Sequence, residues 1–225
     1  MGLQFDLAEW LPQLLSGLVV TVEITVLCIA MGIVVGLFLT MARLYGTRPI
    51  YWAATVYINF FRGTPILVQL FLVYYGLPSL GIRLEPFVAG VLALGLNTSA
   101  YQAEYFRGAI QSLPSGQMLA ARSIGMSRAQ ALRWVVLPQA LRLVIPPWSN
   151  ELILMLKYSS IVFFATVTDL MGAGRIIASE TFRYFEVFIL VAALYLVLVL
   201  ALSWGLRRLE ARLRVPGLGG TGTGG

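Results

Sequence analysis

The chain has 225 residues, of which 59% are hydrophobic and 12% are charged, with a formal net charge of +6. This composition leaves too little polar surface for an ordinary water-soluble domain, so it predicts a membrane protein. The chain has no histidine and one cysteine, Cys28, inside an apolar run, so the usual zinc ligands and the commonest catalytic base are lacking. We therefore expect no metal site and no catalytic residue in this chain.

Apolar segments of membrane length recur along the chain. About 20 helical residues, at 1.5 Å each, cross the roughly 30 Å hydrocarbon core of a bilayer. Residues 6–15 are expected to lie at the membrane surface ahead of the first span, in which Gly32 and Gly36 weakly indicate close helix packing. The second span begins near Pro65, because Thr64 can cap a helix and a first-turn proline needs no donor. The predicted spans, five in all, cover residues 18–42, about 65–77, about 86–103, about 147–164 and 187–206.

Five spans place the two termini on opposite sides of the membrane. With the N-terminus outside, twelve of the sixteen basic residues fall in inner segments and three in outer ones, which satisfies the positive-inside rule. The remaining basic residue, Lys157, lies within the fourth span. The sequence thus predicts an all-α, polytopic membrane protein with an outer N-terminus and an inner C-terminus.

The inner segment between the third and fourth spans is unusually long. Residues 1–214 are expected to form one transmembrane domain that includes this loop, residues 104–142, and residues 215–225 to form a flexible Gly/Thr tail. The loop residues predict a helix over 117–124, a break at Gly125, and a second helix from Ser127 to a stop near Pro138. Such a loop can dock a soluble partner. An amphipathic helix lying on anionic lipid is the alternative.

The loop also carries an ordered motif. Leu119-Ala120-Ala121 is followed after three residues by Gly125, after nine more by Val135, and then by Val136 and Leu137-Pro138. This pattern resembles the Glu-Ala-Ala loop of permease subunits of ATP-binding-cassette importers. Two positions depart from it, since Leu119 replaces the glutamate and Val135 replaces isoleucine. The first change removes a carboxylate that can help to hold such a loop or its partner.

Four further segments are similar to permeases for polar amino acids. They are residues 60–71, 100–110, 181–186 and 202–213. The resemblance implies a permease subunit of an ATP-driven amino-acid importer, with a type I importer-like bundle in a bacterial cytoplasmic (inner) membrane. It implies four kinds of partner: a second permease, identical or homologous; two ATPase subunits; an extracytoplasmic amino-acid-binding protein; and membrane lipid, with no nucleic acid. The chain has no Gly-x-x-x-x-Gly-Lys-Ser/Thr loop, so ATP and Mg are expected on the partner ATPase, and no cofactor is expected on this chain.

The resemblance also implies that the loop, over residues 116–138, couples the permease to its ATPase. The residues assigned to this contact are Gln117, Leu119, Ala120, Ala121, Arg122, Gly125, Met126 and Arg128.

Charges inside the fourth span are the candidates for a substrate pathway. Charged side chains within a bilayer are costly, so they usually face a partner or a wet cavity. Glu151 and Lys157 lie about 120° apart around a helix, with Asn150 close to the face of Lys157. We expect them to line the pathway, although interhelical pairing or snorkelling is the alternative. Arg62 is instead expected to be a cytoplasmic interfacial anchor. The neutral residues assigned to the same pathway are Asn97, Ser99, Tyr101 and Gln69.

Two other classes of function compete with this interpretation. An ion-coupled secondary transporter could use Glu151 and Lys157 as a proton relay, but it needs no docking loop and commonly shows paired repeats within one chain. An intramembrane hydrolase needs a nucleophile and a base, and the absence of histidine counts against it.

Overall fold

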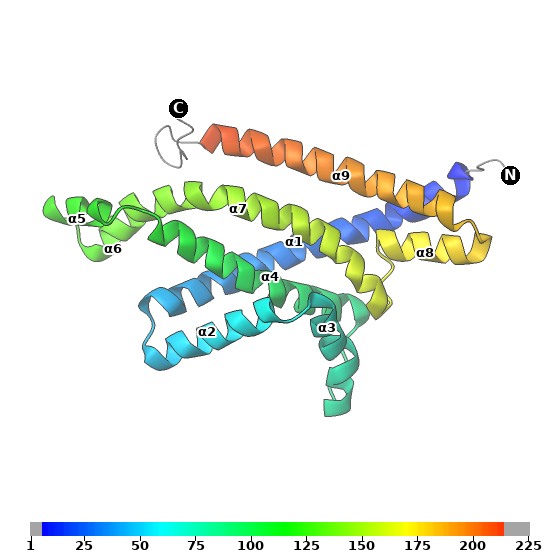
Figure 1. Ribbon diagram of the computed structural model, residues 1–225, viewed down its shortest axis with the longest axis horizontal. Coiled ribbons are helices and arrows are strands. Elements are labelled where there is room, and N and C mark those ends of the chain that lie inside the picture. The colour runs from blue at the N-terminus through cyan, green and yellow to red at the C-terminus, as the bar shows by residue number, and fades with distance from the viewer. Residues whose placement is uncertain (1–5, 214–225) are drawn as a thin grey trace.

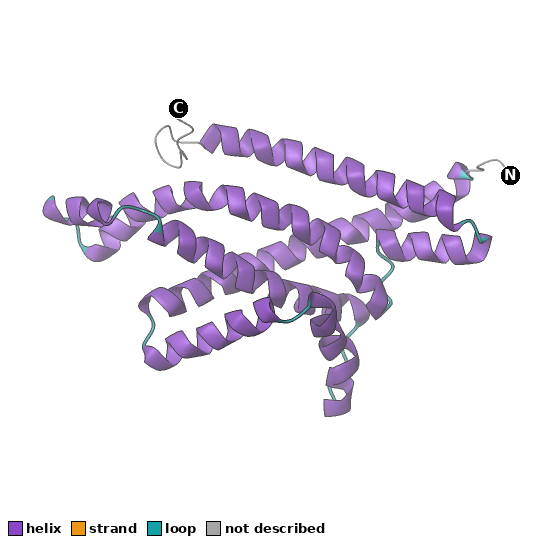
Figure 2. Ribbon diagram, in the orientation of Figure 1, coloured by secondary structure: helices purple, strands orange, loops and turns teal. Residues whose placement is uncertain are grey.

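The computed structural model describes residues 6–213, and this part of the chain is helical, without strands (Figures 1 and 2). The all-α prediction is confirmed. The helices are α1 (Leu7–Tyr45), α2 (Arg48–Gly63), α3 (Ile66–Phe71), α4 (Pro86–Gln111), α5 (Ser115–Ser123), α6 (Arg128–Ala131), α7 (Leu137–Tyr158), α8 (Leu170–Thr181) and α9 (Tyr184–Leu213). Short π- and 3-10-helical turns follow α3, α6 and α7. The predicted tail, residues 215–225, lies outside the described residues.

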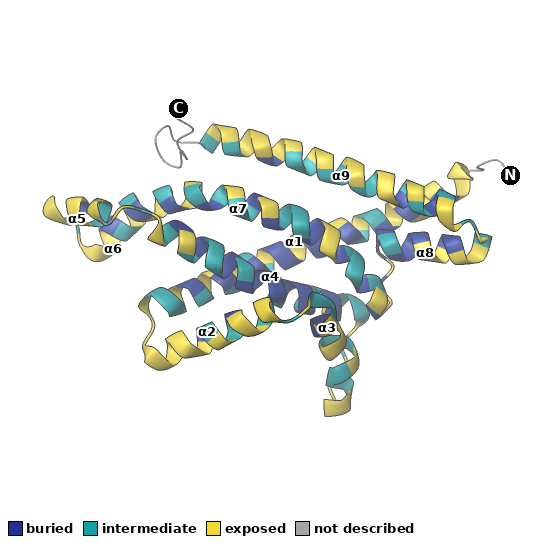
Figure 3. Cartoon of the chain, in the orientation of Figure 1, coloured by how far each residue is buried: buried dark blue, intermediate teal, exposed yellow. Residues whose placement is uncertain are grey.

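The centre of the bundle is the contact between α1 and α4. Figure 3 shows buried residues gathered along α4, whereas α9 is largely exposed. A Cβ at Gly32 would clash with the side chain of Gln102, and a Cβ at Gly36 would lie 3.1 Å from the carbonyl oxygen of Ser99. The close packing predicted from these two glycines is therefore confirmed.

The first turns of α1 differ from the prediction. Residues 6–15 were expected at the membrane surface, but α1 begins at Leu7 and continues without a break. Trp10 and Leu14 are buried there in one apolar cluster with Leu170 and Ile177 of α8. This packing explains the difference, since burial against α8 removes these side chains from the interface that their amphipathic pattern suggested.

An elbow separates α2 from α3. The two elements, with the turns that follow α3, are bent by 107° at Thr64 and Pro65. Thr64 directly follows the last residue of α2 and donates through Oγ1 to the carbonyl of Phe60 at 2.8 Å, and Pro65 precedes α3. The helix start near Pro65 is confirmed, but the expected N-terminal cap by Thr64 is wrong because its hydroxyl serves the preceding helix.

The loop between α4 and α7 follows the predicted order with one correction. α5 ends at Ser123, Gly125 has φ 89°, and Ser127 caps α6 by accepting from the backbone amide of Gln130 at 3.2 Å. The predicted stop near Pro138 is wrong, because a π-helical turn leads from α6 directly into α7, where this proline occupies the first turn. A proline there removes no needed donor, so the helix continues to Tyr158.

Two helices, α1 and α9, are long and apolar enough to cross a membrane by themselves. The number rises to four if two bent pairs each count as one span: α2 with α3 and its turns, and residues 128–165 with α8. The predicted third span coincides with α4, which is not among these candidates. Its polar residues face the bundle interior, where Thr98, Ser99 and Gln102 are buried. The number of five spans and their orientation therefore stay predictions.

The bundle has two distinct ends, and the loop between α4 and α7 lies at one of them. In Figure 1, α5, α6 and the turn between α1 and α2 lie at one end, and the C-terminal end of α9 points the same way. α8 and the first turns of α1 and α9 lie at the other end. We refer to the end with α5 and α6 as the inner end, according to the predicted orientation.

Candidate functional site

A cavity of about 320 Å³ lies where the elbow meets α4 and α7. Glu151, from α7, is the charged residue in its wall, and the other polar residues are hydroxyls and one amide. The wall consists of Thr64, Pro65, Ile66, Asn97, Tyr101, Tyr105, Glu151, Leu154 and Tyr158.

The carboxylate of Glu151 is held by neutral donors. Thr98 donates to its Oε1 at 2.7 Å, and the hydroxyl of Tyr105 donates to its Oε2 at 3.2 Å. The residue is only 5% exposed, and none of the ion pairs among residues 6–213 includes it. A buried carboxylate without a basic partner is electrostatically incomplete, so this cavity favours a ligand that carries a positive charge.

A polar network behind Glu151 fixes its position. Gln102 donates to the hydroxyl of Thr98 at 3.2 Å, and Trp148 of α7 donates to Gln102 at 3.1 Å. Gln102, Tyr105 and Trp148 were not among the predicted site residues. A signal for part of this set exists in the sequence, since Thr98, Gln102 and Tyr105 recur at spacings of four and three on one face of α4.

The predicted neutral residues divide between the cavity wall and the packing around it. Asn97 donates to Gln69 at 2.9 Å and to the carbonyl of Phe61 at 3.0 Å, and Gln69 donates to the same carbonyl at 2.9 Å. These amide groups therefore hold the elbow against α4. Ser99 lies on the α2 side of α4, where its hydroxyl is 2.8 Å from that of Tyr57. Of the four, Asn97 and Tyr101 line the cavity.

Lys157 and Asn150 are not brought to the cavity. Lys157 is exposed and lines a different hollow between the end of α7, α8 and α9, together with Ser160, Met171, Phe188, Val191, Ala192 and Tyr195. Asn150 is exposed. The angular separation expected between Glu151 and Lys157 explains this arrangement, because side chains about 120° apart on one helix face different neighbours.

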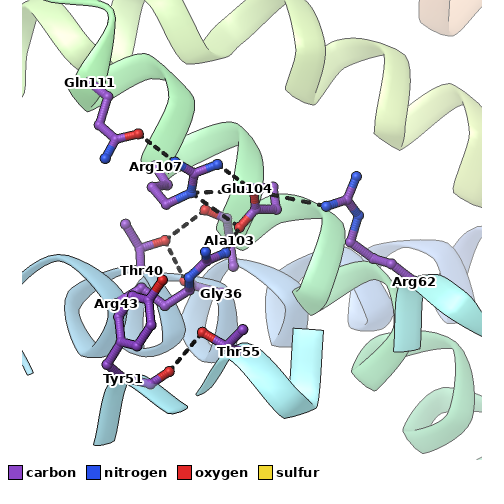
Figure 4. A network of polar contacts seen from close by, with 10 residues as sticks. All are labelled: Gly36, Thr40, Arg43, Tyr51, Thr55, Arg62, Ala103, Glu104, Arg107 and Gln111. Atoms are coloured by element: carbon purple, nitrogen blue, oxygen red, sulfur yellow. Dashed lines mark hydrogen bonds and ion pairs between the residues drawn. The ribbon is translucent and has the colours of Figure 1, made fainter. Parts of the chain in front are cut away.

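Glu104 of α4 gathers three arginines, Arg43, Arg62 and Arg107, around its carboxylate (Figure 4). Arg43 of α1 pairs with its Oε1, Arg107 lies 2.6 Å from its Oε2, and Arg62 of α2 lies 3.8 Å from the same oxygen. The guanidinium of Arg62 also stacks over the ring of Tyr101, 5.3 Å from its centroid.

The position of Arg62 differs from the expected interfacial anchor. α2 continues for 16 residues from Arg48, which corresponds to a rise of about 24 Å. It packs along α1 and α4, with Ile58 buried against Ala100 and Ala103. Arg62 is therefore carried away from the inner end to the level of Tyr101. The misplacement arose because the second span was expected to begin only after this residue.

The loop residues assigned to coupling have unequal exposure. Leu119 is 70% exposed, and Ala120, Arg122 and Gly125 are also exposed. Ala121 is only 4% exposed, so its methyl group packs within the loop. Gln117 and Met126 are half-buried, whereas Arg128 is exposed and its guanidinium lies over the ring of Tyr45, 5.8 Å from the centroid.

Comparisons with known proteins show the family to which the chain belongs. Residues 11–215 match the family described as "Binding-protein-dependent transport system inner membrane component". The probable glutamine ABC transporter permease protein GlnM of Bacillus subtilis (strain 168) is 41% identical over 199 residues, covering 88% of this chain and 92% of the relative. The glutamine transport system permease protein GlnP of Escherichia coli (strain K12) is 39% identical over 218 residues, covering 95% and 100%.

A solved structure has the same fold over nearly the whole chain. It is a crystal structure of an amino acid ABC transporter with histidines, and it is 43% identical, with a TM-score of 0.89. The match covers 94% of this chain and 100% of that one. A structure of the MetNI methionine ABC transporter in an inward-facing conformation is 20% identical with a TM-score of 0.77, which shows the fold alone.

Proposed function

Because this chain belongs to the family of binding-protein-dependent transport system inner membrane components, we propose that its Glu151 cavity is part of the pathway for an amino acid. The chain is a permease subunit of an ATP-driven amino-acid importer in the bacterial inner membrane, and it is not an enzyme. Permeases of this family work in general with a partner permease, ATPases and a substrate-binding protein. Residues 1–214 form its single domain in this proposal.

The single observation that carries the proposal is the state of Glu151. It is buried in a cavity and receives two hydroxyl donors, and no ion pair includes it among the described residues. The α-ammonium group of an amino acid supplies the missing positive charge and more hydrogen-bond donors. Tyr101 and Tyr105 supply aromatic surface and a hydroxyl beside it.

The exposed face of α5 carries the coupling contact in this proposal. Leu119, Ala120 and Arg122 point outward, and Gly125 ends the helix in a left-handed conformation. ATP and Mg then bind to the partner ATPase, and closure of the ATPase pair moves this loop. Because Ala121 is buried, we assign it to the packing of the loop and not to the contact itself.

Uptake of radiolabelled L-glutamine into proteoliposomes that contain the complete transporter tests the pathway assignment. L-Glutamine is the first probe because the two relatives described above are named for glutamine. We expect Glu151→Gln to lower uptake about tenfold or more, since one charged interaction is lost. Glu23→Gln is the matched control, because Glu23 is an exposed carboxylate of α1. Equal uptake by the two variants would refute the assignment.

The energy source separates this function from an ion-coupled secondary transporter, which no specific observation favours. Uptake should follow ATP supplied to the ATPase side and should persist when ionophores collapse the ion gradients. Uptake that follows a gradient without ATP would contradict the proposal.

A further inference from the structure

Arg62 lies between the cavity and the Glu104 cluster. It precedes the wall residue Thr64 by two positions, and its guanidinium covers the ring of Tyr101, which is also part of the wall. On the other side it meets Glu104 at 3.8 Å. If the elbow lies within the bilayer, as the predicted spans imply, a guanidinium there is costly to keep and normally serves a partner or a pathway.

Among the three arginines at Glu104, Arg62 is the least engaged. Its side chain is 43% exposed, compared with 17% for Arg43 and 28% for Arg107. Arg107 makes hydrogen bonds to both carboxylate oxygens, and Arg43 makes one to Oε1, whereas the contact of Arg62 is beyond hydrogen-bond distance. Glu104 therefore keeps two close cations if Arg62 turns away.

An amino acid carries two opposite charges, and the wall of the cavity contains a charged partner for only one of them, the ammonium group. Glu151 suits the ammonium group, but Lys157, the predicted partner of the carboxylate, lies in the separate hollow by α9. Arg62 offers a planar pair of donors that matches a carboxylate in two-point geometry. The contact with the face of Tyr101 uses the charge of the guanidinium and not its N–H donors, so those donors can still bind a carboxylate.

We propose that Arg62 binds the α-carboxylate of the transported amino acid on the inner side of the cavity. When the substrate binds, Arg62 leaves the carboxylate of Glu104 and pairs with that of the substrate, while the ring of Tyr101 holds the guanidinium in place. The proposal rests on the assignment of the Glu151 cavity to the pathway. It makes Arg62 a specificity residue that selects amino acids over amines of the same side chain.

The test compares two ligands that differ only in the carboxylate. L-Glutamine and 4-aminobutanamide, which is glutamine without its carboxylate, are titrated against the purified permease–ATPase complex in lipid nanodiscs, without the binding protein. We expect wild type to prefer L-glutamine, and Arg62→Gln to weaken L-glutamine binding about tenfold while 4-aminobutanamide binds within about twofold of its wild-type affinity. Arg62→Lys should recover only part of the preference, because lysine lacks the two-point geometry.

Arg43→Gln is the matched control, since it removes a closer partner of Glu104 on the side of α1. It should leave the preference for L-glutamine unchanged. If Arg62→Gln weakens both ligands equally, or if Arg43→Gln abolishes the preference as well, the role of Arg62 as a carboxylate contact is refuted. Suppose that Arg62→Gln still prefers L-glutamine over 4-aminobutanamide, and that Glu151→Gln weakens the binding of both ligands. This result would refute the role of Arg62 but not the assignment of the cavity. Unchanged binding of both ligands in Glu151→Gln refutes the cavity assignment itself.

Discussion

Replacing Gly32 with alanine should destabilise the bundle through Gln102. The added methyl group would meet the amide of Gln102 and lie 2.9 Å from Cγ2 of Thr98. Gln102 is fully buried, and its amide donates to the carbonyl of Ile29 at 3.4 Å and to the hydroxyl of Thr98 at 3.2 Å. Losing both bonds costs about 1–2 kcal/mol, and overpacking adds about 1–3 kcal/mol. We expect the free energy of unfolding to fall by about 3 kcal/mol.

Equilibrium unfolding in mixed micelles, followed by tryptophan fluorescence, measures this change. Gly205→Ala is the control, because a Cβ there has no atom within 4 Å and the substitution should stabilise α9 slightly. In a Gln102→Ala background the amide is gone, so the cost of Gly32→Ala should shrink by about 2 kcal/mol. The same cost in both backgrounds, or no cost in either, would refute the argument that Gln102 transmits the strain.

Three further predictions concern single elements. Asp169→Ala removes the side chain that caps the amide of Gly172 (2.9 Å) and accepts from the hydroxyl of Tyr195 (3.2 Å). Unfolding in mixed micelles should therefore show a free energy of unfolding lower by about 2 kcal/mol, and a decrease below about 0.5 kcal/mol would contradict this expectation. Gly125→Val forces a branched residue to φ 89°, so we expect faster proteolysis of the loop and weaker substrate-stimulated ATP hydrolysis; normal stimulation would show that the break is not needed. Leu119→Asp should leave the unfolding free energy within about 0.5 kcal/mol, because the side chain is 70% exposed, but should lower the same stimulation, and full stimulation would favour a lipid-facing loop.

The parts of the fold that could be predicted are those with a strong local signal. The apolar runs of α1 and α9 give long helices, and Gly125 adopts the left-handed conformation. In both cases the cause lies within a few residues of the chain, either in hydrophobicity or in backbone conformation. Such signals survive folding because tertiary contacts do not have to create them.

The depth of Arg62 could not be predicted in the same way. Residues 48–63 form an amphipathic helix that packs on α1 and α4, but in the sequence they are a mixed stretch that ends in an apparent boundary at Pro65. Only the long-range contacts of Tyr57 and Ile58 with α4 show that α2 runs along the bundle, away from its inner end. The surroundings of Glu151 could not be predicted either. Its residue type suggested a site, but its hydrogen-bond donors lie on α4 and reach it only because α4 and α7 pack together.

The continuity of the chain from α6 into α7 gives the permease a mechanical lever. Arg128 at the start of α6 and Glu151 are 23 residues apart, or about 35 Å, along one helical path that includes the π-helical turn after α6 and contains Pro146 and Pro147. If this rod tilts rigidly by about 5° at its loop end, simple geometry moves the carboxylate by about 3 Å, which is the length of one hydrogen bond. In such a rigid tilt, a small displacement of the loop would move Glu151 away from its hydroxyl donors on α4.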